Sequence, residues 1–203
     1  MPASFRSVNA TVEAGSGTRD AILRRSVEIA SLEGLEGLTI GRLATEFDMS
    51  KSGIFRHFGS KQELQLATLD RAMTLFRHEV IEPAAAAEPG LDRLRALLAN
   101  YLRYLERDVL PGGCFLTAAG AEFDGRPGAV RDAVAASSRG WGRELERQAK
   151  LARDKGELPA DVEPAQLVFQ LSAYTTRANA AYQLYGDRRA FRRARTAITK
   201  LLG

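Results

Sequence analysis

Residues 39–58 read TIGRLATEFDMSKSGIFRHF, and this stretch decides the fold. Apolar residues recur at helical spacing on both sides of Asp48-Met49, which predicts two short amphipathic helices separated by a tight turn. Ala44 stands where two such helices must cross closely, and Ile54 and Phe58 face back toward a small shared core. The pattern indicates a helix-turn-helix, whose second helix fits the major groove of B-DNA, about 12 Å wide.

The second of these helices carries the residue types that contact nucleic acid. Residues 49–62 contain three basic side chains and no acidic one. Ser50 and Ser52 can bind a phosphate or a base edge, and Lys51 suits a phosphate or a guanine. Two short helices joined by a turn also occur in many helical proteins that never touch DNA, so a structural role is the alternative at this point.

Hydrophobic periodicity outside this stretch is helical as well, and no segment sustains the alternation that is typical of strands. We therefore expect an all-α protein of about nine helices. A flexible arm is predicted over residues 1–17, and a three-helix domain containing the helix-turn-helix over residues 18–64. A long helix over residues 61–81 is predicted to join this domain to a C-terminal helical bundle, which lies within residues 65–203.

The composition is that of an ordinary globular chain, since 45% of its 203 residues are hydrophobic and 27% are charged. No window approaches the roughly 18 consecutive apolar residues of a membrane helix, and the first residues lack the apolar core of a signal peptide. The single cysteine, Cys114, cannot form an internal disulfide. These features predict a cytoplasmic protein with no membrane partner.

The net charge of +4 comes from the C-terminal end of the chain. Residues 187–203 carry six basic side chains and one acidic side chain. The overall charge therefore gives no support to a DNA site elsewhere in the chain. The basic tail itself is open to interpretation as a membrane-surface patch or a nucleic-acid patch.

Enzyme motifs are absent from the sequence, since GxxxxGK[ST], GxSxG and HExxH do not occur. The chain has two histidines and one cysteine, too few for a usual zinc site. We therefore expect no enzyme, no metal and no cofactor. A helical dimer that binds protein or ligand but no DNA is the main alternative to a DNA-binding protein.

A series of short motifs, spaced over residues 18–64, identifies a wider pattern. These motifs are Thr18-Arg19-Asp20-Ala21-Ile22-Leu23, Ala30, Gly37, Leu38-Thr39-Ile40, Leu43-Ala44, Met49-Ser50-Lys51-Ser52-Gly53-Ile54-Phe55, His57-Phe58 and Lys61-Gln62-Glu63-Leu64. Together they resemble the tetracycline-repressor (TetR) family of bacterial transcription regulators. Asp48 departs from the family's usual turn glycine, and Phe55 departs from its usual tyrosine, so a phosphate contact through a tyrosine hydroxyl is in doubt.

The resemblance implies which residues contact double-stranded DNA. The implied set is Arg19, Thr39, Ser50, Lys51, Ser52, Phe55, Arg56, His57 and Lys61. Thr39 and Lys61 each stand at the start of a helix and are implied to bind phosphates. Arg6 in the arm is implied to lie in the minor groove, whereas the imidazole of His57 is equally suited to capping or packing.

The resemblance also implies a homodimeric repressor that leaves a palindromic operator when an unidentified small-molecule effector binds. Residues 65–203, similar to the family's C-terminal bundle in architecture only, would bind the effector and dimerise through the last two helices. The effector would tilt the long helix and move the two recognition helices from their spacing of about 34–36 Å. Apolar spacing along residues 167–185 suits such an interface, with packing inside one chain as the alternative. The implied interface residues are Leu167, Leu171, Ala178, Ala181, Tyr185, Phe191 and Ile198.

Aromatic residues of the C-terminal half are candidates for the effector pocket, although each of them is alternatively a core residue. They are Tyr101, Tyr104, Phe115, Phe123, Trp141, Phe169 and Tyr174. Arg177 is the only charged residue within residues 164–186, so we expect it to pair with Glu122 or Asp124, or to meet an acidic ligand. Cys114 is interpreted either as a small buried residue or as a redox or electrophile sensor.

Overall fold

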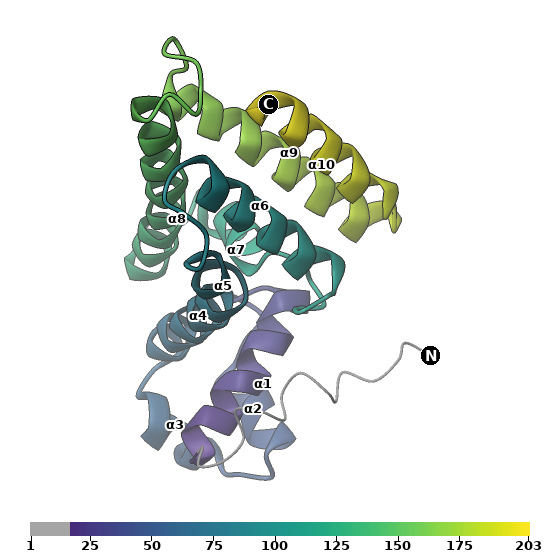
Figure 1. Cartoon of the computed structure of the whole chain (residues 1–203). Coiled ribbons are helices and arrows are strands. Elements are labelled where there is room, and N and C mark those ends of the chain that lie inside the picture. The colour runs from purple at the N-terminus through teal and green to yellow at the C-terminus, as the bar shows by residue number, and fades with distance from the viewer. Residues whose placement is uncertain (1–16) are drawn as a thin grey trace.

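The computed structural model describes residues 17–203, and the regular structure within this range is entirely helical (Figure 1). Residues 1–16, which include most of the expected arm and Arg6, lie outside the described residues. The helices are α1 (Thr18–Glu33), α2 (Ile40–Glu46), α3 (Lys51–Phe58), α4 (Lys61–Phe76), α5 (Glu82–Ala84), α6 (Leu91–Glu106), α7 (Phe115–Phe123), α8 (Ala129–Asp154), α9 (Pro164–Tyr185) and α10 (Arg189–Leu202). A π-helical turn, Arg77–Ile81, makes α4 and α5 one continuous rod, so the described range holds nine helices and the all-α prediction is confirmed. No helix in it is long and apolar enough to span a lipid bilayer.

The first three helices enclose a small hydrophobic core at one end of the molecule (Figure 1). Its buried side chains are Ile22, Leu23, Ile29, Leu38, Leu43, Ala44, Ile54, Phe58 and Leu64. α2 and α3 have seven and eight residues, too few to be stable as isolated helices. The burial of their apolar faces in this core is therefore what holds them in place.

Side-chain caps begin the short helices and α4. The capping hydrogen bonds run to Thr39 Oγ1 from Arg42 N (3.2 Å), to Ser50 Oγ from Gly53 N (3.0 Å) and to Ser60 Oγ from Glu63 N (3.0 Å). Each bond satisfies an amide that the first turn of a helix leaves without a helical partner. In the turn between α2 and α3, Asp48 has a φ of +49°, a left-handed conformation that Asp tolerates better than most residues. The turn therefore forms with an aspartate, and not a glycine, in the left-handed conformation.

α4 connects the small core to the large core of the C-terminal bundle. Leu64 in its first turn is buried in the small core, whereas Leu69 and Phe76 are buried in the large one. At the far end of the rod, Asn100 of α6 donates a hydrogen bond from Nδ2 to the carbonyl of Val80 in the π-helical turn (3.1 Å). This hydrogen bond joins α6 to the rod that carries the N-terminal helices.

α9 and α10 lie side by side at the C-terminal end of the bundle (Figure 1), where α9 also packs against α8. The apolar seam expected at the dimer interface is buried inside the single chain, as are its two companions on α10. The residues concerned are Leu167, Leu171, Ala178, Ala181, Phe191 and Ile198. Within the single chain these side chains are buried, although Ala178 and Ala181 line the groove between α9 and α10, and their assignment to a dimer interface stays a prediction. Of the expected set, Tyr185 is exposed.

A tight loop before α7 packs directly on α1. Gly112 N donates a hydrogen bond to Ser31 Oγ (2.8 Å), and a Cβ atom added to Gly112 would lie 1.6 Å from the carbonyl oxygen of Ser31. The loop and α1 can approach this closely only because residue 112 has no side chain.

Replacement of Gly112 by alanine is expected to lower the free energy of unfolding by about 1–3 kcal/mol, since the loop must move off α1. Gly120 in α7 is the matched control, because a Cβ there meets no atom within 4 Å. Gly120→Ala is expected to stabilise the protein by roughly 0.5–1 kcal/mol through helix propensity. Urea denaturation of both variants checks the pair, and equal effects would contradict the close contact.

Candidate functional site

α3 presents one buried face and one exposed face. Ile54 and Phe58 point into the small core, where they are fully or nearly fully buried. The opposite face carries the exposed side chains Ser50, Lys51, Ser52, Phe55 and Arg56. Phe55 is 53% exposed, an uncommon position for a phenyl ring unless a partner covers it. The expected contact residues of α3 therefore share one accessible surface.

Lys51 joins this surface to the start of α2, a proximity that the sequence did not reveal. A Cβ atom added to Gly41 would lie 3.3 Å from Lys51 Cε and 3.8 Å from Lys51 Nζ. The ammonium therefore lies over the first turn of α2, the helix that the exposed Thr39 caps. Because the amides at the start of a helix carry partial positive charge, the two elements together favour an anion at this point.

The other basic residues near this surface differ in whether an acid already neutralises them. Among the described residues, neither Lys51 nor Arg56 has an acidic partner, whereas Arg42 pairs with Glu33 through both carboxylate oxygens. Lys51 and Arg56 are therefore the exposed cations of α3 that a binding partner can contact.

Lys61 is occupied by the protein itself. Its Nζ donates hydrogen bonds to Glu36 Oε1 (2.6 Å) and to the carbonyl of Glu36 (2.8 Å), and the ammonium holds the pKa of the Glu36 carboxyl below its ordinary value. A phosphate must therefore compete with Glu36 for this lysine. The position of Lys61 at the start of α4 did not predict this pairing with Glu36.

Arg19 and His57 both lie against the ring of Phe58. The guanidinium carbon of Arg19 is 5.2 Å from the ring centroid, and the imidazole centroid of His57 is 6.2 Å away at a tilted angle. His57 is half-buried. Its ring therefore packs on α3, one of the alternatives left open, while Arg19 remains exposed beside the same helix.

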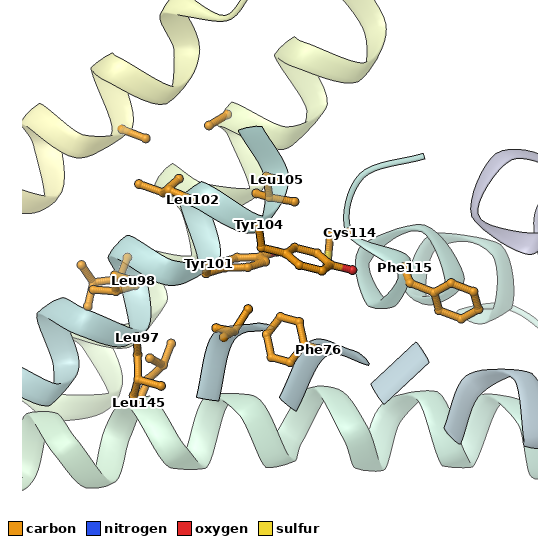
Figure 2. Close-up of a cluster of buried hydrophobic side chains, with 14 of the residues drawn as sticks. Phe76, Leu97, Leu98, Tyr101, Leu102, Tyr104, Leu105, Cys114, Phe115 and Leu145 are labelled. Carbon is orange, nitrogen blue, oxygen red and sulfur yellow. The ribbon is translucent and has the colours of Figure 1, made fainter. Parts of the chain in front are cut away.

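The predicted pocket aromatics Tyr101, Tyr104 and Trp141 gather around Phe76 at the end of α4. The ring centroid of Phe76 lies 5.2 Å from that of Trp141, 5.7 Å from that of Tyr101 and 5.8 Å from that of Tyr104. All three pairs have edge-to-face geometry. Figure 2 shows the two tyrosines of α6 above Phe76, with Cys114 beside them. Burial raises the pKa of both tyrosines well above the ordinary value, so both phenols are neutral.

Cys114 is a buried free thiol within this cluster. Figure 2 shows Cys114 beside Tyr101 and Tyr104. Phe115 and Phe123, also predicted for the pocket, are buried in the large core. Cys114 therefore has the environment of a small core residue. A redox or electrophile sensor needs an accessible thiolate, and this thiol is buried.

The structure places three of the predicted pocket residues on the periphery, because α9 has one outward face. Phe169 is 70% exposed, Tyr174 is half-buried, and Arg177 is exposed with its guanidinium 5.9 Å from the ring centroid of Tyr185. The expected pairing of Arg177 with Glu122 or Asp124 is not formed. Arg177 lies on the solvent side of its helix, where it needs no buried partner.

A polar pocket of about 300 Å³ lies where the π-helical turn meets α6, and sequence reasoning missed it. It is lined by His78, Glu79, Glu82, Pro83, Asn100, Arg103, Tyr104 and Arg107. Its charged residues come from the π-helical turn, the start of α5 and the end of α6, and each of these segments alone has the pattern of a solvated face. A second groove, about 290 Å³, runs between α9 and α10 beside Arg177 and Tyr185.

Metal chemistry has no arranged site in the part of the chain that the structure describes. No group of three or more His, Cys, Asp or Glu side chains is placed to hold a metal ion there.

Two family profiles match the chain. The profile described as "Bacterial regulatory proteins, tetR family" matches residues 22–68, and "Tetracyclin repressor-like, C-terminal domain" matches residues 90–198. The first covers the helix-turn-helix with its supporting helices, and the second covers most of the bundle. A search of curated proteins found no significant match.

Several solved structures share the whole fold. A TetR transcriptional regulator from Chloroflexus aurantiacus J-10-fl is 24% identical with a TM-score of 0.80, over 90% of this chain and 92% of its own. NemR of E. coli in its reduced form is 20% identical with a TM-score of 0.76, over 91% and 97%. AibR in complex with isovaleryl coenzyme A and operator DNA is 20% identical with a TM-score of 0.71, over 91% and 97%. At these identities the likeness shows the fold alone.

Neighbouring substitutions on α3 are expected to separate its two faces. Ile54→Ala removes a fully buried side chain and should lower the free energy of unfolding by about 2–5 kcal/mol. Phe55→Ala removes an exposed ring and should change it by less than about 0.5 kcal/mol. Urea denaturation followed by circular dichroism measures both, and a large loss for Phe55→Ala would mean that α3 has no free face.

Proposed function

The chain belongs to the tetracycline-repressor (TetR) family of bacterial transcription regulators, and from this premise we propose that it is a homodimeric repressor released from a palindromic operator by a small-molecule effector. One observation carries the DNA-binding part of the proposal. The outer face of α3 combines exposed Phe55 with two cations, Lys51 and Arg56, that no acid neutralises within the described range.

The geometry of this surface supports separate roles for its residues, some in phosphate contacts and others in base contacts. Lys51 reaches the first turn of α2, which Thr39 caps, and both residues are suited to the phosphate backbone, which sets position. Ser50 and Ser52 lie in the first turn of α3, where small polar side chains can reach base edges in the major groove. Phe55 is suited to an apolar contact, such as a thymine methyl group. Lys61 would share its ammonium between Glu36 and a phosphate.

The outward face of α9 supports dimerisation, and it differs from the seam expected from periodicity. Phe169 and Leu184 are 70% and 73% exposed, and they flank the small exposed residues Ala173, Thr176 and Ala180. These five positions fall on one side of the helix at a period of 3.6 residues. Small residues between two apolar anchors allow a second copy of α9 to approach closely.

The proposed effector acts on the rod formed by α4 and its π-helical turn. AibR was solved with isovaleryl coenzyme A and operator DNA, so one protein of this fold binds both kinds of partner. In this chain the aromatic cluster around Phe76 and the polar pocket beside the π-helical turn both include residues of the rod and of α6. A ligand that binds one rod angle better than another shifts the equilibrium, with typical couplings of about 1–3 kcal/mol.

Duplexes selected from a random pool provide the test of DNA binding. Lys51→Ala and Thr39→Ala are each expected to weaken binding to a selected duplex by about 5–20-fold, and Lys51→Ala should also reduce the salt dependence by about one counterion. Fluorescence anisotropy over a salt series measures both effects.

Lys200→Ala is the matched control, because Lys200 is exposed on α10 in the basic tail. It should leave the affinity unchanged. An equal loss in this variant would favour the tail as a general nucleic-acid patch, and selection of no duplex at all would overturn the proposed function.

A charge on the outer face of α9 is expected to break the homodimer. Leu184→Glu should convert a dimer into a monomer of 22.2 kDa, because it places a carboxylate in an apolar contact. Leu32 of α1 has a similar exposure outside α9, so Leu32→Glu should leave the mass unchanged. Sedimentation equilibrium distinguishes the two results, and a dimer in both variants would exclude this face.

A further inference from the structure

Glu122, in the last turn of α7, contacts the N-terminal domain through an unusual arrangement. Its Oε2 accepts a hydrogen bond from the backbone N–H of Leu35 (2.8 Å), and its Oε1 accepts one from the N–H of Glu36 (2.9 Å). One carboxylate thus holds two consecutive amides of the turn between α1 and α2. Hydrogen bonds to an ionised acceptor are about twice as strong as neutral ones, so this contact is both directional and firm.

The turn is shaped to receive this carboxylate. Gly34 has a φ of +82°, and a Cβ atom added there would lie 2.6 Å from Glu122 Oε1. Leu35 is buried, and among the described residues the hydrogen bond from its amide goes to Glu122. Without Glu122, the N–H of Leu35 would therefore be a buried donor with no partner.

The same turn is held by α4 from its other side. Gln65 Nε2 donates to the carbonyl of Leu35 (2.9 Å), and Lys61 Nζ donates to the carbonyl of Glu36 (2.8 Å). Nη1 of Arg126, a residue just beyond α7, lies 3.7 Å from Glu36 Oε2. The turn is therefore a junction where α1, α4 and the end of α7 meet at polar contacts.

The opposite end of α7 is attached to α9. Cys114 N, at the start of α7, donates a hydrogen bond to Asn179 Oδ1 (3.2 Å). Asn179 is buried on α9, the helix whose outer face we assign to dimerisation. α7 therefore runs from the proposed dimer helix to the junction beneath the helix-turn-helix, with a side-chain hydrogen bond at each end.

We propose that Glu122 is a positioning residue through which the C-terminal bundle sets the angle of the helix-turn-helix domain and hence the spacing of the two recognition helices. This inference rests on the proposed function, since spacing has meaning only for a dimer on a two-part operator. A shift of α7 moves the carboxylate, and the two amides carry the turn with it. The carboxylate serves here as an acceptor of fixed geometry rather than as one partner of an ion pair.

Amide hydrogen exchange of the full-length protein tests the contact without DNA. Glu122→Ala should raise the exchange rates of the Leu35 and Glu36 amides at least tenfold, because their acceptor is lost, while amides of the α3 core keep their rates. Glu122→Asp retains the charge but withdraws the carboxylate by one methylene, so it should also raise both rates. Asp124→Ala, which removes a neighbouring exposed carboxylate, should leave them unchanged. Wild-type rates in Glu122→Ala would overturn the proposal.

Spacing discrimination tests positioning as distinct from a general loss of stability. The wild type should bind its selected duplex far better than the same duplex with one base pair inserted between the half-sites. In Glu122→Ala this ratio should fall at least fivefold, because a freer domain tolerates the wrong spacing, whereas Asp124→Ala should keep the ratio. A variant that loses affinity for both duplexes by the same factor would overturn the proposal. If the wild type selects no duplex, the proposed function fails, and the exchange rates still report separately on the contact.

Discussion

The rest of the structure depends on α4 being buried in two hydrophobic cores at once. Leu64 lies in the small core that supports α3, and Phe76 lies among the aromatic side chains of the large core. A helix is stiff along its axis, so a change at one end is carried to the other. The two halves of the molecule therefore share one mechanical element, and neither can reorganise around α4 without affecting the other.

The small core also determines which side of α3 can be functional. Because Ile54 and Phe58 are buried, the opposite side of the helix is exposed, and Phe55 and Arg56 lie on it, whereas His57 is half-buried. Ion pairing then decides which basic side chains near this surface keep an uncompensated charge. Glu33 and Glu36 engage Arg42 and Lys61, while the cations on α3 itself are left without acids among the described residues. The potential of the site therefore comes from the pairing pattern and owes little to the net charge of the chain.

Periodicity in α9 identified an apolar seam, which is buried against neighbouring helices within the single chain. Leu167 and Leu171 pack inside the chain, whereas Phe169 and Leu184 are exposed, and the face that carries them is the one we propose for a second copy. Phe169 and Arg177 were expected in the interior because an apolar helix with one charge has the pattern of a buried helix. α9 is instead peripheral, so its outward apolar residues need a cover from outside and its arginine is solvated.

The sequence by itself determined the features that depend on neighbours a few residues apart. The helix-turn-helix, the caps at Thr39 and Ser50, the buried face of α3 and the all-helical class all follow from spacing within single helices. Only the tertiary structure decided which elements meet: that Lys51 lies over α2, that Lys61 is held by Glu36, and that the carboxylate of Glu122 reaches the amide of Leu35. The reason is physical. Helix formation and capping are local hydrogen-bond and burial problems, whereas a polar contact between residues 87 positions apart exists only once the packing of the two cores has brought them within 3 Å.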